Sequence, residues 1–383
     1  MLFFSSLLFL YIATYFLSFL RTLSVQHLRN LNDVSIDLSH QINVFYGDNG
    51  SGKTSILEAV ALVGLGRSFR SHKTRSLVNH QETELTVFTH LDVSDTGGGS
   101  LPVGLQKSRN GTGAIKVSGE TIRSAAILAK QLPLLIINAG SFQLIEGSPV
   151  QRRQFLDWLV FHVKPGFSEL WRGLQKTLKQ RNSLLRRDKI SRSDIKPWDN
   201  ELARISQAID AARSEVFLDL IECFEQFGQE FTVDQLNIEM EYYRGWDKEL
   251  SIEVALENDF ERDCRDGYTH QGPQRADIKI RSQKKPAVDV LSRGQEKSLV
   301  CALTIAQAYL YQQSAEGKCV FLIDDLLAEL DKQHINTLAK WLTELNVQAL
   351  VTGVNKEDLY APWNRDQINV KMFHVKHGEV DEV

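Results

Sequence analysis

The octapeptide Gly47-Asp48-Asn49-Gly50-Ser51-Gly52-Lys53-Thr54 constrains the fold of this chain more than any other segment. It matches the pattern G-x-x-x-x-G-K-[ST], follows the apolar run 42–46 and precedes a helical pattern of apolar residues. A strand, a glycine loop and a helix in this order wrap backbone N–H groups around a phosphate, and the positive end of the helix faces the same group. The segment therefore predicts a nucleoside triphosphate site in an α/β domain.

Individual side chains of this loop have separate predicted roles. Lys53 is expected to reach the β- and γ-phosphates, and Thr54 is expected to hold Mg²⁺ through its hydroxyl group. The predicted ATP-binding residues in this segment are Gly47, Asp48, Asn49, Gly50, Ser51, Gly52, Lys53, Thr54 and Ser55.

Two adjacent carboxylates follow a buried strand in the last third of the chain. The apolar run 320–323 leads directly into Asp324 and Asp325. Burying two neighbouring carboxylates without a cation is costly, and a bound Mg²⁺ removes that cost. We expect Asp324 to bind Mg²⁺ through water and Asp325 to position or activate the attacking water. The alternative, that both residues cap the following loop, remains open at this point.

The pentapeptide Leu291-Ser292-Arg293-Gly294-Gln295 lies between these two motifs, just before a helical pattern. It resembles the LSGGQ signature of ABC-type ATPases, with Arg293 in place of the first glycine. In that superfamily the serine and the helix N-terminus of one subunit bind the γ-phosphate held by the other subunit. The resemblance implies an ATP-dependent homodimer. It implies ATP contacts by Ser292, Arg293, Gly294 and Gln295, and catalytic roles for Ser292 and Lys53 together with Asp325.

Other superfamily elements are present in part. Residues 328–331 resemble the D-loop, and Gln143 is a candidate for the Q-loop contact. Thr352-Gly353 stands where the superfamily has its H-loop histidine, so the sequence does not identify the sensor of the γ-phosphate.

The spacing of the motifs predicts the domain organisation. Lys53 and Ser292 are 239 residues apart (292 − 53), more than in transporter subunits, and the intervening segment lacks the long coiled coil of SMC proteins. Residues 149–231 show helical periodicity. We expect an α/β fold: a P-loop ABC-type ATPase head with an antiparallel β subdomain (residues 19–148 and 264–383) and a mostly helical second domain, a short arm, at 149–263.

Six ordered segments resemble the RecF family from about Phe19 onward. They are Phe45–Ser55, Gly66–Arg70, Arg152–Asp157, Gly272–Asp277, Leu291–Gln295 and Leu322–Asp325. The resemblance implies ATP-driven dimerisation on duplex DNA near single-strand gaps, slow DNA-dependent ATP hydrolysis, and work with RecR and RecO to load RecA. It also implies a cytoplasmic, nucleoid-associated protein. Gln274 departs from the family pattern, which usually has histidine there.

A basic segment is the candidate DNA-binding surface. The chain has a net charge of −4, but nine Lys or Arg and only two acidic residues lie between positions 172 and 196. Such a patch binds phosphates with little reading of bases. The candidate contacts are Arg172, Lys176, Lys179, Arg186 and Arg187. Alternatively, this segment pairs with the acidic stretch 215–263. Separately, Arg275 and Asp277 are candidates for a structural ion pair.

The apolar segment 2–20 admits two interpretations. It carries no charge and is long enough to span a bilayer as a helix. However, a strand pattern follows without a linker, which favours a mis-assigned start for residues 1–18 over an N-terminal anchor. Membrane anchoring would suit the alternative function, a nucleotide-binding subunit of an ABC-type transporter. The mass of the native N-terminus distinguishes the two interpretations.

Overall fold

The computed structural model describes residues 18–383 except 72, 94–98, 188, 232, 316, 326–329 and 365–367. The predicted extension 1–18 and loop 328–331 therefore lie largely outside the described residues. Ser18, Phe19 and Leu20 begin strand β1 (Ser18–Leu28), so the end of the apolar segment is strand and not helix. Among the residues described, no helix combines the length and the apolar character needed to cross a membrane.

The chain forms two compact units. The first combines the residues up to Ser141 with Tyr311–Val383, and the second is Phe142–Leu310.

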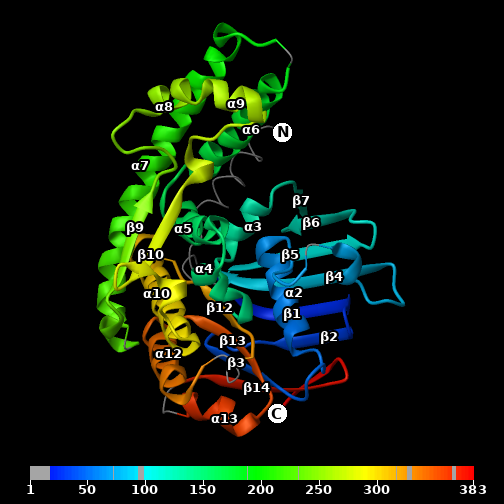
Figure 1. Ribbon diagram of the computed structural model, residues 1–383. Coiled ribbons are helices and arrows are strands. Elements are labelled where there is room, and N and C mark those ends of the chain that lie inside the picture. The colour runs from blue at the N-terminus through cyan, green and yellow to red at the C-terminus, as the bar shows by residue number, and fades with distance from the viewer. Residues whose placement is uncertain are drawn as a thin grey trace. The chain divides into compact units, whose positions relative to one another are not determined.

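A mixed sheet forms part of the first unit (Figure 1). The phosphate loop and the two adjacent carboxylates follow two of its strands. Its order is β15-β14-β3-β13-β12-β8, and every neighbouring pair is parallel except the terminal hairpin β14–β15. The buried runs of Ile, Val, Leu and Phe that suggested strands suit a sheet covered on both faces. The strands are β3 (Ile42–Tyr46), β8 (Leu134–Ile137), β12 (Val320–Ile323), β13 (Gln348–Gly353), β14 (Val370–Lys376) and β15 (Glu379–Glu382).

The second sheet of this unit is the expected antiparallel subdomain. Its order is β2-β1-β4-β5-β6-β7, and all its pairings are antiparallel. The alternation of apolar and polar residues fits strands with one face in the core. Besides β1, the strands are β2 (Leu31–Asp37), β4 (Glu84–Val93), β5 (Gly99–Ser108), β6 (Gly113–Val117) and β7 (Glu120–Ile122).

Helix α2 (Lys53–Leu65) lies between the two sheets. Eleven of its 13 residues are buried, and it contacts β1, β4 and β5 of the antiparallel sheet and β8 and β13 of the mixed sheet. A helix that is apolar on all sides requires cover on all sides. One apolar cluster therefore runs from Leu23 through Val60 to Leu350. The remaining helices of this unit are α3 (Ala125–Gln131), α12 (Lys332–Glu344) and α13 (Lys356–Tyr360).

The terminal hairpin supports the phosphate loop. Its turn, His377-Gly378, has positive φ at both residues, and the Gly378 N–H donates to Ser51 O at 2.8 Å. A Cβ on Gly378 would lie 2.1 Å from Asn30 O. The turn thus packs against the phosphate loop.

The second unit is mostly helical, as predicted from residue 149. Helices α6 (Phe167–Leu185) and α7 (Arg192–Glu230) form an antiparallel pair, and Ser191 and Asp194 make a capping box at the start of α7. The other helices are α4 (Gln143–Glu146), α5 (Pro149–Val163), α8 (Ile252–Asn258), α9 (Phe260–Asp266) and α10 (Arg293–Ala315), which begins here.

A small sheet joins residues 277–286 to the helical part of this unit. Strand β10 (Asp277–Ser282) pairs along its length with β9 (Ile238–Tyr243) and at its end with β11 (Lys285–Pro286). Arg152 of α5 also binds Asp277, with Nε 2.7 Å from Oδ1. The predicted Arg275–Asp277 pair was therefore wrong, and the Arg275 guanidinium instead lies over the Tyr268 ring. The predicted domain bounds stay a prediction.

We expect Gly378→Ala to destabilise the protein by about 1–3 kcal/mol, since alanine disfavours positive φ and its Cβ meets Asn30 O. Gly119→Ala is the matched control, because Gly119 also has positive φ but no atom lies within 4 Å of an added Cβ. Urea unfolding of both variants measures the difference. Equal losses of stability would show that contact with the β1–β2 turn is unimportant.

Candidate ATP site

The phosphate loop has the backbone that its glycines predicted. Gly47, Gly50 and Gly52 have φ values of 149°, 80° and 122°, which disfavour any side chain. A Cβ on Gly47 would lie 2.2 Å from Val375 O, so strand β14 leaves no room for one. Gly52 precedes α2 without a side-chain cap, so the first N–H groups of the helix are free of a side-chain acceptor. This arrangement suits an anionic ligand.

Lys53 lies inside the loop. Its Nζ donates to Gly47 O at 2.8 Å and to Asp48 O at 2.9 Å. Burial lowers the pKa of the Lys53 ammonium group, against the opposing attraction of Asp325, Asp324 and Asp48. A phosphate arriving beside Lys53 would favour its charged form, so nucleotide binding and Lys53 protonation should reinforce each other.

Ser51 supplies a second indication of a ligand. Its hydroxyl is buried and has no hydrogen-bond partner in the described part of the chain. Buried hydroxyl groups are normally hydrogen-bonded, so this orphan group fits a phosphate oxygen that the protein alone does not supply.

The order of strands brings the two predicted motifs together. Parallel strand β13 lies between β3, which leads into the phosphate loop, and β12, which leads into Asp324. Thr54 Oγ1 donates to Asp324 Oδ1 at 2.8 Å. A hydroxyl and a carboxylate in direct contact are the two protein ligands that a phosphate-bound Mg²⁺ would need here, and the ion would supply charge neutralisation. The prediction that both residues serve one metal remains untested.

Thr352 completes this group, although sequence reasoning missed it. Its hydroxyl donates to Asp324 Oδ1 at 2.8 Å and accepts the Asp325 N–H at 2.8 Å. The sequence showed only that position 352 is not a histidine. The detectable signal was its position at the end of a buried strand, since the carboxyl ends of neighbouring parallel strands meet at one edge.

Asp325 is held in an uncommon backbone conformation. Its φ is 56°, in the left-handed region that aspartate tolerates better than most residues. Its side chain is exposed, while its N–H is fixed by Thr352. The predicted role in activating water is compatible with this exposure but stays a prediction.

These groups line a cleft of about 940 Å³ within the first unit. The phosphate loop, Asp324, Asp325 and Thr352 form one part of its wall. Four arginines contribute to the remainder: Arg29, Arg70, Arg75 and Arg109. The abundance of positive charge suits a polyanionic ligand.

The predicted signature belongs to the second unit, where it starts helix α10. Ser292 and Gln295 cap the helix reciprocally: the Ser292 N–H donates to Gln295 Oε1 at 2.8 Å, and the Gln295 N–H donates to Ser292 Oγ at 3.4 Å. Arg293 is largely exposed and pairs with Glu146 and Glu296. The predicted ATP contacts of Ser292–Gln295, and of Gln143 in α4, remain predictions.

Asp331, the last residue of the predicted D-loop, caps α12 by accepting the His334 N–H at 3.0 Å.

The candidate DNA residues are mostly where a surface role requires them. Arg172, Lys176, Lys179, Arg186 and Arg187 are all exposed. Arg172, Lys176, Lys179 and Arg186 repeat at helical spacing, so they follow one face of α6 and its end.

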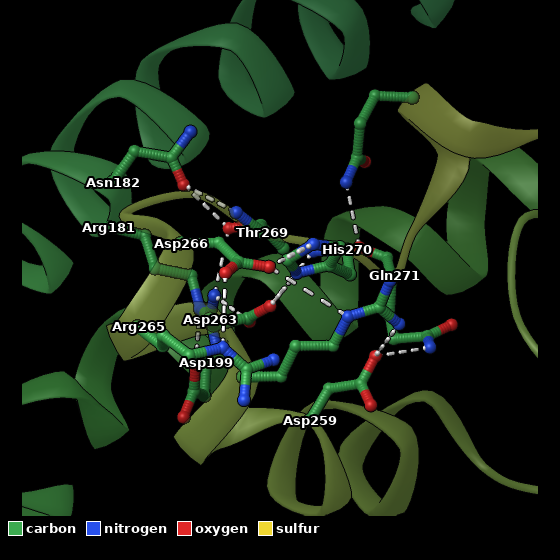
Figure 2. A network of polar contacts seen from close by, with 12 residues as sticks. Arg181, Asn182, Asp199, Asp259, Asp263, Arg265, Asp266, Thr269, His270 and Gln271 are labelled. Atoms are coloured by element: carbon green, nitrogen blue, oxygen red, sulfur yellow. Dashed lines mark hydrogen bonds and ion pairs between the residues drawn. The ribbon is translucent and has the colours of Figure 1, made fainter.

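One basic residue of this segment is not on the surface. Arg181 is fully buried and binds Asp199 (2.7 Å), Asp263 (2.6 Å) and Thr269 (2.8 Å) (Figure 2). In Figure 2, His270 lies next to the same group, with Nδ1 2.7 Å from Asp263 Oδ1. Pairing of the basic segment with acidic residues 215–263 is therefore correct for Arg181, as it is for Arg192, which pairs with Glu257 and Glu261.

Comparison with known proteins identifies the family. The family model "RecF/RecN/SMC N terminal domain" matches residues 19–380. The chain is 46% identical, over 94% of its length and 98% of the relative's, to the DNA replication and repair protein RecF of Cellvibrio japonicus.

The chain belongs to the RecF family. It is also 44% identical to the RecF protein of Pseudomonas paraeruginosa, over 95% of this chain and 97% of that one. A solved structure described as the recombination mediator protein RecF-ATP in the RecFOR pathway has the same fold, with a TM-score of 0.83 and 24% identity over 96% of this chain and 100% of that one. The RecF resemblance and the ATPase-head fold predicted from the sequence are thus confirmed.

Thr352→Val should reduce ATP turnover by at least about tenfold, because Asp324 loses a hydrogen bond and the Asp325 N–H loses its acceptor. Thr352→Ser retains the hydroxyl group and should keep near wild-type turnover. Phosphate release at saturating ATP measures both. Wild-type turnover in the valine variant would remove Thr352 from the site.

Proposed function

We propose that this chain is an ATP-controlled DNA-binding protein of replication and recombinational repair. The observation that carries the proposal is the contact of Thr54, Asp324 and Thr352 beside Lys53, in a cleft rich in positive charge. The family supports it, because its curated relatives are named DNA replication and repair proteins. ATP with Mg²⁺ is the proposed ligand.

ATP acts in this proposal as a switch between monomer and homodimer. The signature residues Ser292–Gln295 of one protomer would complete the ATP site of the other, and hydrolysis, slow and stimulated by DNA, would separate them. Lys53 binds the phosphates, and Asp325 orients the attacking water. The proposed activity is therefore a weak DNA-dependent ATPase.

Duplex DNA next to single-strand gaps is the proposed partner of the exposed face of α6. Lysine and arginine side chains along a helix neutralise backbone phosphates without reading sequence. The proposed protein partners are RecO and RecR, with which this protein would help to load RecA in the cytoplasm at the nucleoid. The transporter alternative is not favoured by any observation on the described residues.

The test is fluorescence anisotropy on a gapped duplex, with and without ATP and Mg²⁺. Binding should tighten with ATP in the wild type and lose that dependence in Lys53→Ala, because the switch then lacks its phosphate contact. If the wild type binds DNA with the same affinity in the presence and absence of ATP and Mg²⁺, the proposal is contradicted.

The DNA surface has its own test. Lys176→Glu with Lys179→Glu should weaken DNA binding and reduce the salt-dependence slope by about 2, at unchanged ATP affinity, since each phosphate contact contributes about 0.9 to that slope. Arg204→Glu with Lys248→Glu, two exposed residues of the same unit outside α6, is the control with the same change in charge. Equal effects of both pairs would indicate a general effect of net charge and would move the DNA surface away from α6.

A further inference from the structure

A fully buried carboxylate lies behind the wall of the cleft. Glu58 is five residues after Lys53 on α2, and its side chain has 0% exposure. A buried charge is tolerated only where partners compensate for its lost hydration. Three donors do so: Arg29 Nε at 3.0 Å, Arg29 Nη2 at 2.9 Å and Ser68 Oγ at 2.5 Å.

Arg29 is fixed by this carboxylate. Its two contacts with Glu58 form a bidentate pair, the strongest geometry for this kind of interaction. Its third nitrogen, Nη1, donates to Ser76 O at 2.7 Å, and its backbone N–H donates to Leu77 O at 2.7 Å. Arg29 therefore joins α2, the β1–β2 turn and the segment 74–77.

Arg70 is held by the same carboxylate, but more loosely. Its Nη1 is 3.5 Å from Glu58 Oε2, and half of its side chain is exposed. Its backbone is better fixed, because Ser68 Oγ accepts the N–H groups of Arg70 (2.9 Å) and Ser71 (3.1 Å) while donating to Glu58. The carboxylate thus organises the loop that follows α2 and leaves the Arg70 guanidinium free to move.

The charges do not cancel. One buried carboxylate faces two guanidinium groups, and both arginines line the cleft that contains the phosphate loop. A net positive charge therefore remains on the wall of the cleft. Because Glu58 is on the helix that begins at Lys53, that charge is held at a set distance from the phosphate loop.

We propose that Glu58 is a positioning residue of the ATP site, which sets where Arg29 and Arg70 present their guanidinium groups to the polyphosphate. Glu58 does not contact the nucleotide. It compensates the charge of the half-buried Arg29 through a bidentate pair, and it holds Arg70 only until a stronger anion enters the cleft. The inference rests on the proposed ATP binding and adds residues that the phosphate-loop pattern does not include.

A double-mutant cycle tests it, with binding of a fluorescent ATP analogue in the presence of Mg²⁺ as the measurement. Glu58→Gln and Arg70→Ala should each weaken binding by about tenfold. The double variant should be weaker than either single variant because Arg29 is also displaced, but clearly less than a hundredfold weaker, because both changes remove the positioned Arg70 guanidinium. Effects that multiply, or wild-type affinity in Glu58→Gln, would overturn the proposal.

Stability must be separated from positioning. Glu58→Gln leaves the half-buried Arg29 without its counter-charge, so the thermal midpoint of each variant is measured beside its affinity. Glu58→Asp keeps the negative charge, but its shorter side chain moves the carboxylate away from Arg70. The Arg70–Glu58 contact is already long at 3.5 Å. Glu58→Asp should stay folded and still weaken ATP binding, whereas wild-type affinity in this variant would contradict the proposal. Glu120→Gln, an exposed residue of β7, is the matched control.

Binding of the analogue by the wild type and by Lys53→Ala distinguishes a failure of this inference from a failure of the proposed function. If the wild-type protein fails to bind the analogue, or Lys53→Ala binds it equally well, the proposed ATP site is wrong. If Lys53→Ala abolishes binding but the Glu58 and Arg70 variants bind normally, only the role of Glu58 is wrong.

Discussion

The burial of helix α2 on all sides is the constraint on which the first unit depends. A helix without a polar face must be covered on both sides, and here two six-stranded sheets cover it. The apolar cluster around α2 contains residues from both sheets, so neither sheet has a complete core without this helix. The helix also starts at the phosphate loop. Consequently the element that fixes the position of Lys53 is itself buried on all sides.

The chemistry of the cleft follows from that placement and from the order of the parallel strands. Three strand ends that are far apart in the sequence supply the glycine loop, the two carboxylates and a threonine hydroxyl. The hydroxyl groups of Thr54 and Thr352 both donate to one carboxylate oxygen of Asp324. Hydrogen bonds within the protein that fix these groups lower the cost of arranging them around a charged ligand.

The sequence predicted those parts of the site that depend on local patterns. The glycine loop, its flanking strand and helix, and the acidic strand end are each contained in a short segment, and periodicity identifies them. Thr352 and Glu58 escaped prediction because their roles depend on partners far along the chain. Position 58 is an ordinary glutamate in a helical pattern until Arg29 and Ser68 are placed against it.

Counting charges along the sequence misses burial for a related reason. It treats Arg181 and Lys179 alike, although one is buried against Asp263 and the other is exposed. Periodicity separates them only when the buried face of α6 is known. The same limitation applies to the pairing of β9 with β10, which composition does not reveal.

The contact between Gly378 and Ser51 has a consequence for biosynthesis. Strand β3 pairs with β14 near the other end of the chain, and the loop that follows β3 rests on the last hairpin. A ribosome delivers these partners more than 300 residues apart. The whole second unit is therefore synthesised before strands β13 and β14, which flank the strand that leads into the phosphate loop. That unit is continuous in sequence, and domains generally fold as units during synthesis. The nucleotide cleft is thus one of the last features of the nascent chain to form.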